Sequence, residues 1–142
     1  MLTMEMLEDA RTALQGIARR TPLDPARGLG KNVFIKAENL QLTGAFKLRG
    51  AYNKIRSLTP DEAERGVIAC SAGNHAQGVA FSCNKLQIMG SIYMPTTTPR
   101  QKIEQVRMFG KEYIDIVLTG DTFDAANSAA IEYARKSGKT FI

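Results

Sequence analysis

One lysine stands where it could act as an amine nucleophile. Lys47 lies within Thr43–Gly50, at what we predict to be a junction between a loop and a helix. Apolar residues follow at helical spacing over 48–55, and Thr43 and Gly44 precede them as turn and cap residues do. The start of a helix carries partial positive charge, which disfavours an ammonium group. Lys47 is therefore a candidate for nucleophilic amine chemistry, although most lysines at helix starts are solvated surface residues.

A second stretch, Ser71–Gly78, could bind an anion. It follows the apolar run Val67–Cys70, which we predict to be a buried parallel strand, and it leads into a helix over about 75–86. Ligands of open α/β sheets bind at the carboxyl ends of the strands, and the free N–H groups of a helix start hold a carboxylate. Asn74 adds a donor that could bond a phenolate-like oxygen. A plain strand–helix turn with an Asx cap gives the same pattern, and His75, the only histidine, fits a cap or packing residue better than a catalytic base.

The elements that would position these stretches alternate between strand and helix. We expect strands over 33–38, 67–70, 88–94, 113–118 and 140–142, and helices over about 3–18, 47–57, 59–66, 75–86, 101–109 and 122–136. Thr21–Leu23 should break the first helix, and Asp24–Pro25 should continue the turn. Such alternation predicts an α/β fold, with a parallel sheet flanked by helices on both faces. Because nothing follows the last strand, we expect the chain to be a piece of something larger.

Composition narrows the function classes. The 142 residues carry a net charge of +5, but the basic residues are scattered and no aromatic ladder accompanies them. We interpret the charge as solvated surface rather than a nucleic-acid interface. Cys70 and Cys83 form neither a disulfide framework nor a zinc site, and we expect reduced structural thiols in a cytoplasmic protein. No metal site, signal peptide or membrane span is predicted.

Four linked stretches resemble the threonine dehydratase (threonine ammonia-lyase) family. They occur in the family's order and spacing, and they are Thr21–Leu23, Lys36–Gln41, Thr43–Ala51 and Ser71–Gly78. The family consists of pyridoxal-phosphate enzymes of fold type II, the tryptophan-synthase-β-like type. The resemblance implies that residues 1–49 open the large catalytic domain and that residues 50–142 form the small α/β domain, with the remainder of the large domain absent.

The resemblance also implies roles for single residues. Lys47 matches the lysine that forms the internal Schiff base with the cofactor, pyridoxal 5'-phosphate, and later moves the α-proton of the substrate. Phe46 matches the aromatic residue that packs near the cofactor ring, and Asn74 matches the asparagine that bonds the ring hydroxyl. The substrate-binding loop is matched by Ser71, Ala72, Gly73, Asn74 and His75.

The implied reaction is a β-elimination that converts L-threonine to 2-oxobutanoate and ammonia, and L-serine to pyruvate. Lys47–Gly50 and Gly73–His75 fit the dehydratases rather than the cysteine synthases, which usually carry Lys-Asp-Arg and Gly-Asn-Thr-Gly at these places. Ala72 stands where serine racemases of this family have a serine, so racemisation is disfavoured. Ala45, where many members have serine, is a departure from the pattern. The implied partner is a small amino acid, with neither nucleic acid nor membrane, and we expect the parent to be a homo-oligomer.

Members of this family are more than twice as long as this chain. Their glycine-rich phosphate loop and the later residue that contacts the ring nitrogen have no counterpart here. We therefore expect an amino-terminal fragment that binds cofactor poorly and does not turn over alone. The alternative is a non-catalytic module that binds a small ligand or another protein. The sequence does not distinguish threonine from serine as the preferred substrate, and it does not reveal allosteric effectors.

Overall fold

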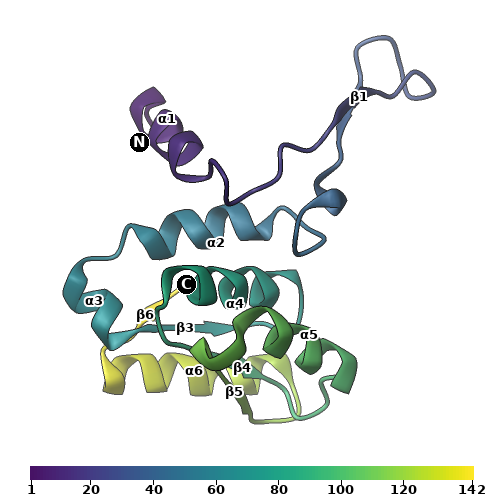
Figure 1. Cartoon of the computed structure of the whole chain (residues 1–142). Helices are drawn as coiled ribbons and strands as arrows, with labels where there is room; N and C mark the ends of the chain where they lie inside the picture. The colour runs from purple at the N-terminus through teal and green to yellow at the C-terminus, as the bar shows by residue number, and fades with distance from the viewer.

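A four-stranded parallel sheet forms the centre of the computed structural model, which describes residues 1–142 (Figure 1). Its strands lie in the order β5-β4-β3-β6. The bounds are β3 Val67–Cys70, β4 Gly90–Met94, β5 Ile114–Leu118 and β6 Thr140–Phe141. All three neighbouring pairs are parallel, which confirms the predicted α/β class.

The strand order reverses beside β3. From β3 the chain moves outward through β4 to β5, and it then returns to place β6 on the other side of β3. The connection from β3 to β4 and the connection from β5 to β6 therefore move in opposite directions along the sheet. In open α/β sheets, this point of reversal is where ligands bind.

Helices cover both faces of the sheet, as predicted. Helices α4 and α5 pack on one face, α6 packs on the other, and α2 lies on the outer side of α4 (Figure 1). The helix bounds are α1 Met4–Ala13, α2 Lys47–Arg56, α3 Pro60–Arg65, α4 Asn74–Leu86, α5 Arg100–Gly110 and α6 Phe123–Ser137, and a 3-10 turn, η2, occupies Lys111–Tyr113. None of these helices combines the length and the apolar composition needed to cross a bilayer.

The core is divided between the two faces because successive side chains of a strand alternate. Val67 and Ala69 of β3 belong to the apolar cluster on the α4 side, whereas Ile68 and Cys70 belong to the cluster on the α6 side. The larger cluster also contains buried side chains of α2, α4, β4 and α5, among them Ile55, Val79, Ile92, Ile103 and Val106. Through Ile55, α2 is thus part of the body that contains the sheet.

A capping box begins α3. The Thr59 hydroxyl accepts a hydrogen bond from the Glu62 amide at 3.3 Å, and the Glu62 carboxylate accepts one from the Thr59 amide at 2.8 Å. Thr59→Ala should lower the free energy of unfolding by about 1 kcal/mol, because the Glu62 amide loses its acceptor, the Thr59 hydroxyl. Urea titration measures this loss, and Thr59→Ser, which keeps a hydroxyl, is the matched control. A Thr59→Ala chain as stable as the control would contradict the prediction.

The amino-terminal segment departs from the sequence prediction in three places. The first helix ends at Ala13 rather than near residue 18, since Gly16 has a φ of 74° and the chain turns there. Leu23–Pro25, predicted to be a break and turn, forms strand β1 and pairs antiparallel with β2, Phe34–Lys36. The predicted strand stops before residue 38 because a 3-10 turn, η1, occupies Glu38–Leu40.

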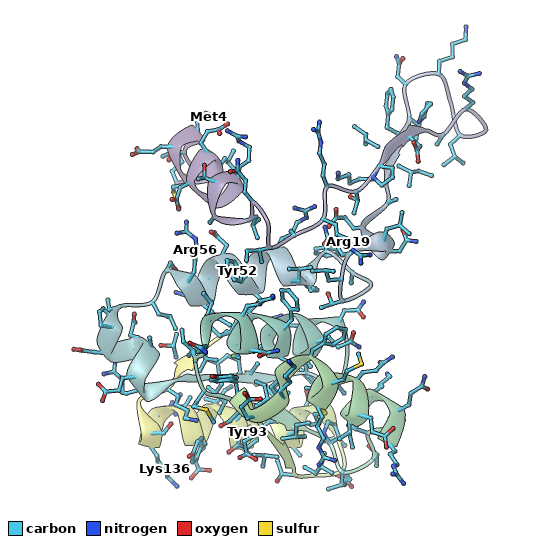
Figure 2. The ribbon with its side chains drawn as sticks, in the orientation of Figure 1. Met4, Arg19, Tyr52, Arg56, Tyr93 and Lys136 are labelled. Atoms are coloured by element: carbon cyan, nitrogen blue, oxygen red, sulfur yellow. The ribbon has the colours of Figure 1, made fainter.

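This segment makes few contacts with the body. The β1–β2 hairpin projects away from the sheet (Figure 1), and every residue of both strands is exposed. No residue of α1 is buried, and its apolar side chains Met4, Met6 and Leu7 are exposed in this chain. An ion pair between Asp9 and Arg56 ties α1 to α2, and Figure 2 shows Arg56 on the side of α2 nearest α1.

Candidate functional site

Helix α2 begins at Lys47, as the spacing predicted. The predicted cap is wrong. The Thr43 hydroxyl donates to the carbonyl oxygen of Ala45 at 3.4 Å, and the residue at the cap position is Phe46, whose side chain makes no capping hydrogen bond. Gly44 makes the turn instead, with a φ of 69° that favours glycine. Lys47 consequently stands in the first turn, directly after a tight turn.

The side chain of Lys47 is exposed, and its amine is within reach of a ligand. Its Nζ lies 5.2 Å from the centroid of the Phe46 ring, a distance at which an ammonium and an aromatic face attract each other. No carboxylate forms an ion pair with Lys47. Phe46 is itself 58% exposed, so the aromatic ring and the amine face solvent together.

A cavity of about 320 Å³ lies beside this lysine, lined by Phe46, Lys47, Gly50, Ala51, Lys54, His75 and Ile142. Residues 47, 50, 51 and 54 are spaced as neighbours on one face of a helix, so α2 presents a single face to the cavity. Lys54 was not predicted as part of the site, although its position seven residues after Lys47 is a signal that could have found it. Two lysines therefore border the cavity.

His75 closes the other side of this cavity. Its Nε2 donates to the carbonyl oxygen of Ile142 at 3.1 Å, and the Ile142 amide donates to the Ile68 carbonyl at 2.9 Å. The ring thus joins the first turn of α4 to the residue that follows β6. The cavity accordingly lies at the point where the strand order reverses.

The loop after β3 leaves backbone donors free. The Gly73 amide donates to the Ser71 hydroxyl at 3.2 Å, and α4 then begins at Asn74. The first intrahelical partner belongs to Gln77, whose amide donates to Gly73, so the first amides of the helix have no acceptor in the chain. Asn74 is exposed, and its side chain makes no hydrogen bond. A helix start of this kind attracts a carboxylate or a phosphate.

The structure brings only part of the predicted set together. Phe46, Lys47 and His75 line the cavity. Asn74 and the loop residues Ser71–Gly73 are not among its lining residues, but they lie next to His75 at the amino end of α4. The amine and the anion-binding end of a helix are thus adjacent features of one edge of the molecule.

An ion-pair network fastens the first turn of α2 to the preceding segment. Glu38 accepts two hydrogen bonds from Arg49, at 2.8 and 2.9 Å, and one from the Thr21 hydroxyl at 2.6 Å. Arg49 also donates to the Arg19 carbonyl at 3.0 Å, and Gln41 donates to the same oxygen at 2.7 Å; Figure 2 shows Arg19 near this end of α2. Hydrogen bonds from Arg49, assisted by Thr21, lower the pKa of Glu38 to about 2. The carboxylate is therefore ionised across the neutral range.

The two cysteines are buried and take no part in this site. Burial raises the pKa of Cys83 to about 12, and burial also raises the pKa of Cys70. A thiol with a raised pKa is a poor nucleophile at neutral pH. Both side chains pack in the core, Cys70 against α6 and Cys83 on the α4 side.

The sequence pattern of a family described as pyridoxal-phosphate dependent enzymes matches residues 14–142 of this chain. This match covers most of the chain, and the chain belongs to that family. The open parallel sheet with a lysine at the start of one helix and a free helix end beside it is the architecture of the family's fold type II.

The chain is also similar in sequence to individual enzymes. The chain is 50% identical over 137 residues to the biosynthetic L-threonine dehydratase IlvA of Halalkalibacterium halodurans, an alignment that covers 94% of this chain and 33% of the relative. The enzyme of the same name from Bacillus subtilis is 56% identical over 111 residues, covering 78% of this chain and 26% of the relative. The chain spans about a third of the length of the curated relatives it matches.

Two solved structures of enzymes superimpose closely on this chain. The processed form of threonine deaminase isoform 2 from Solanum lycopersicum superimposes with a TM-score of 0.87 at 43% identity, covering 97% of this chain and 41% of that one. Maize serine racemase superimposes with a TM-score of 0.85 at 28% identity, covering 97% of this chain and 42% of that one. The similarity to the two threonine dehydratases and to threonine deaminase confirms the resemblance that the four sequence motifs indicated.

Proposed function

We propose that this chain is the amino-terminal part of a pyridoxal-phosphate-dependent L-threonine dehydratase, and that Lys47 is its catalytic lysine. The observation that carries the proposal is the free amine of Lys47 at the start of α2, in a cavity that also reaches His75 at the amino end of α4. The similarity to enzymes named as L-threonine dehydratases supports the choice of threonine. L-Serine is proposed as a second substrate.

The side chains present suit pyridoxal phosphate. An unpaired primary amine can bind an aldehyde covalently, and Phe46 offers an exposed aromatic face beside that amine. Asn74 has an amide with no partner in the chain, which can donate to a ring oxygen. Unpaired N–H groups at the start of α4 can hold a carboxylate. The donor set therefore matches an aromatic aldehyde bound together with an amino acid.

The residues of this chain have separate roles in the proposed reaction. When bound, the cofactor withdraws electrons from the α-carbon of the amino acid. Lys47, as an unprotonated amine, takes the α-proton. The loop Ser71–Gly73 and the first amides of α4 hold the substrate carboxylate, while Asn74 orients the ring. The β-hydroxyl leaves as water, and a water molecule then hydrolyses the imine form of the released product, which gives ammonia with 2-oxobutanoate from threonine or pyruvate from serine.

The proposal includes three features of the parent protein. Residues 1–49 belong to its large domain and residues 50–142 to its small domain. The parent is a homo-oligomer, for which the uncovered apolar residues of α1 leave surface available. It acts in the cytoplasm, where the free buried thiols of Cys70 and Cys83 would persist.

The test is a fused chain in which residues 1–142 replace the matching segment of the Bacillus subtilis relative. With pyridoxal phosphate, the fused chain should release ammonia and 2-oxobutanoate from L-threonine, measured by a coupled reduction of the 2-oxo acid. The unchanged relative is the positive control. A fused chain that folds, as judged by circular dichroism, but releases no ammonia while the relative does would contradict the proposal.

A further inference from the structure

Helices α2 and α4 come into backbone contact at one glycine. Gly78 of α4 is buried, and a β-carbon added to it would lie 3.0 Å from the amide nitrogen of Leu48. The same atom would lie 3.0 Å from the carbonyl carbon of Lys47 and 3.1 Å from its carbonyl oxygen. Contacts of 3.0 to 3.1 Å are tighter than nine in ten contacts of real β-carbons, so the neighbouring atoms would have to give by a few tenths of an ångström. Glycine is therefore the residue that fits the observed approach of these helices without any displacement.

The neighbours of Gly78 cannot move aside on their own. All three are backbone atoms of the first turn of α2, so a side chain at position 78 could be accommodated only by a shift of one helix against the other. The position is also held from within α4, because the buried Ser82 hydroxyl donates to the Gly78 carbonyl at 2.7 Å. A larger residue at 78 would therefore displace the backbone of Lys47 relative to α4.

This contact lies between the two helices that carry the proposed site, Lys47 on α2 and Asn74 on α4. Gly78 follows Asn74 by four residues, so both lie on the same face of α4, one turn apart. On the facing helix, the contact falls on Lys47 itself. The distance between the Lys47 amine and the donors at the start of α4 is thus set by how closely the helices approach at Gly78.

We propose that Gly78 is a positioning residue, which by lacking a side chain places Lys47 at the correct distance from Asn74 and the anion-binding start of α4. The inference rests on the proposed function of Lys47. Gly78 touches neither cofactor nor substrate; it acts through the backbone of Lys47. Replacement should impair the attachment of pyridoxal phosphate to Lys47 and slow the step in which Lys47 moves a proton.

The test compares Gly78→Ala with Gly28→Ala in the fused chain. Both substitutions add one methyl group, but a β-carbon at Gly28 meets no atom within 4 Å. The apoprotein is incubated with pyridoxal phosphate for graded times. The Lys47 amine condenses with the aldehyde with loss of water, and hydride from borohydride fixes the product as a secondary amine. The modified fraction of Lys47 is read from the mass of its peptide.

In Gly78→Ala, we expect labelling of Lys47 to slow about tenfold and kcat for threonine to fall about tenfold, because misplacement by less than an ångström costs rates of this order. KM for threonine should change less than about twofold, since the carboxylate site on α4 is intact. Circular dichroism should show a folded chain, as alanine is a better helix former than glycine. Gly28→Ala should behave as the unsubstituted chain does.

Each result of this comparison supports or overturns the role proposed for Gly78. Labelling and kcat equal to those of Gly28→Ala would overturn the role of Gly78 while leaving the proposed function intact. If the unsubstituted fused chain is not labelled at Lys47, the proposed function fails and this inference fails with it. If Gly78→Ala does not fold, Ala51→Val takes its place, since it enlarges a buried residue of α2 in the core cluster shared with α4. Unchanged labelling of Lys47 in a folded Ala51→Val chain would then overturn the inference.

Discussion

Replacing Lys47 by alanine in the fused chain should lower the rate of ammonia release from threonine by about 10³-fold or more, because the variant loses both the covalent attachment point and the group that moves the α-proton. The surroundings of Lys47 explain why its amine can bind an aldehyde and move a proton. Its amine is exposed, pairs with no carboxylate and stands over the ring of Phe46. It is thus free to react once deprotonated.

Two further variants test whether activity requires the reactive amine of Lys47, rather than a positive charge or any lysine beside an aromatic ring. Lys47→Arg keeps the positive charge but cannot lose its proton in a protein, so it should be as inactive as alanine. Lys85 is the matched control, because its exposed Nζ lies 6.0 Å from the centroid of the Phe81 ring, an arrangement like that of Lys47 and Phe46. Lys85→Ala should retain activity. Activity in Lys47→Ala equal to that of Lys85→Ala would show that Lys47 is not the catalytic lysine.

The parallel sheet and the start of α2 could be predicted from the sequence. Strands β3 and β4 are wholly buried, β3 is an apolar run, and both are followed by turn residues. The spacing of apolar residues after Lys47 predicts the helix directly. Boundaries in the amino-terminal segment were harder to predict. Strand β2 falls within the strand predicted over 33–38. Strand β1 is three residues long, fully exposed and ends at Pro25, so neither hydrophobic alternation nor length distinguishes it from a loop.

Contacts between distant segments could not be predicted. The closeness of Gly78 to Lys47 depends on how two helices cross, and no pattern within either helix encodes that distance. Lys54 is an intermediate case. Its place in the cavity follows from helical spacing once Lys47 is chosen, but only the structure shows that this face of α2 borders the cavity.

Glu38→Gln should lower the free energy of unfolding of the 142-residue chain by about 2 kcal/mol at pH 7, because the carboxylate that binds Arg49 and Thr21 becomes a neutral amide. The lowered pKa of Glu38, about 2 against an ordinary value of 4.5, reports the same stabilisation. At 1.36 kcal/mol per pKa unit, the shift corresponds to about 3 kcal/mol. Partial exposure of the pair, with side chains 16% and 32% exposed, reduces this figure to about 2 kcal/mol.

The dependence on pH identifies the ionised carboxylate as the cause. Because the pKa of Glu38 is lower in the folded chain than in the unfolded chain, its stabilisation is complete above the unfolded value of 4.5 and is lost as pH falls toward about 2. Urea titrations at several pH values should therefore show the difference between the parent and Glu38→Gln shrinking over that interval. Glu132, paired with Lys136 on the exposed face of α6, is the control, and Glu132→Gln should leave the free energy of unfolding nearly unchanged. A deficit in Glu38→Gln that is as large at pH 2 as at pH 7 would mean that the amide disturbs packing, and that the ion pair with Arg49 does not fasten the first turn of α2.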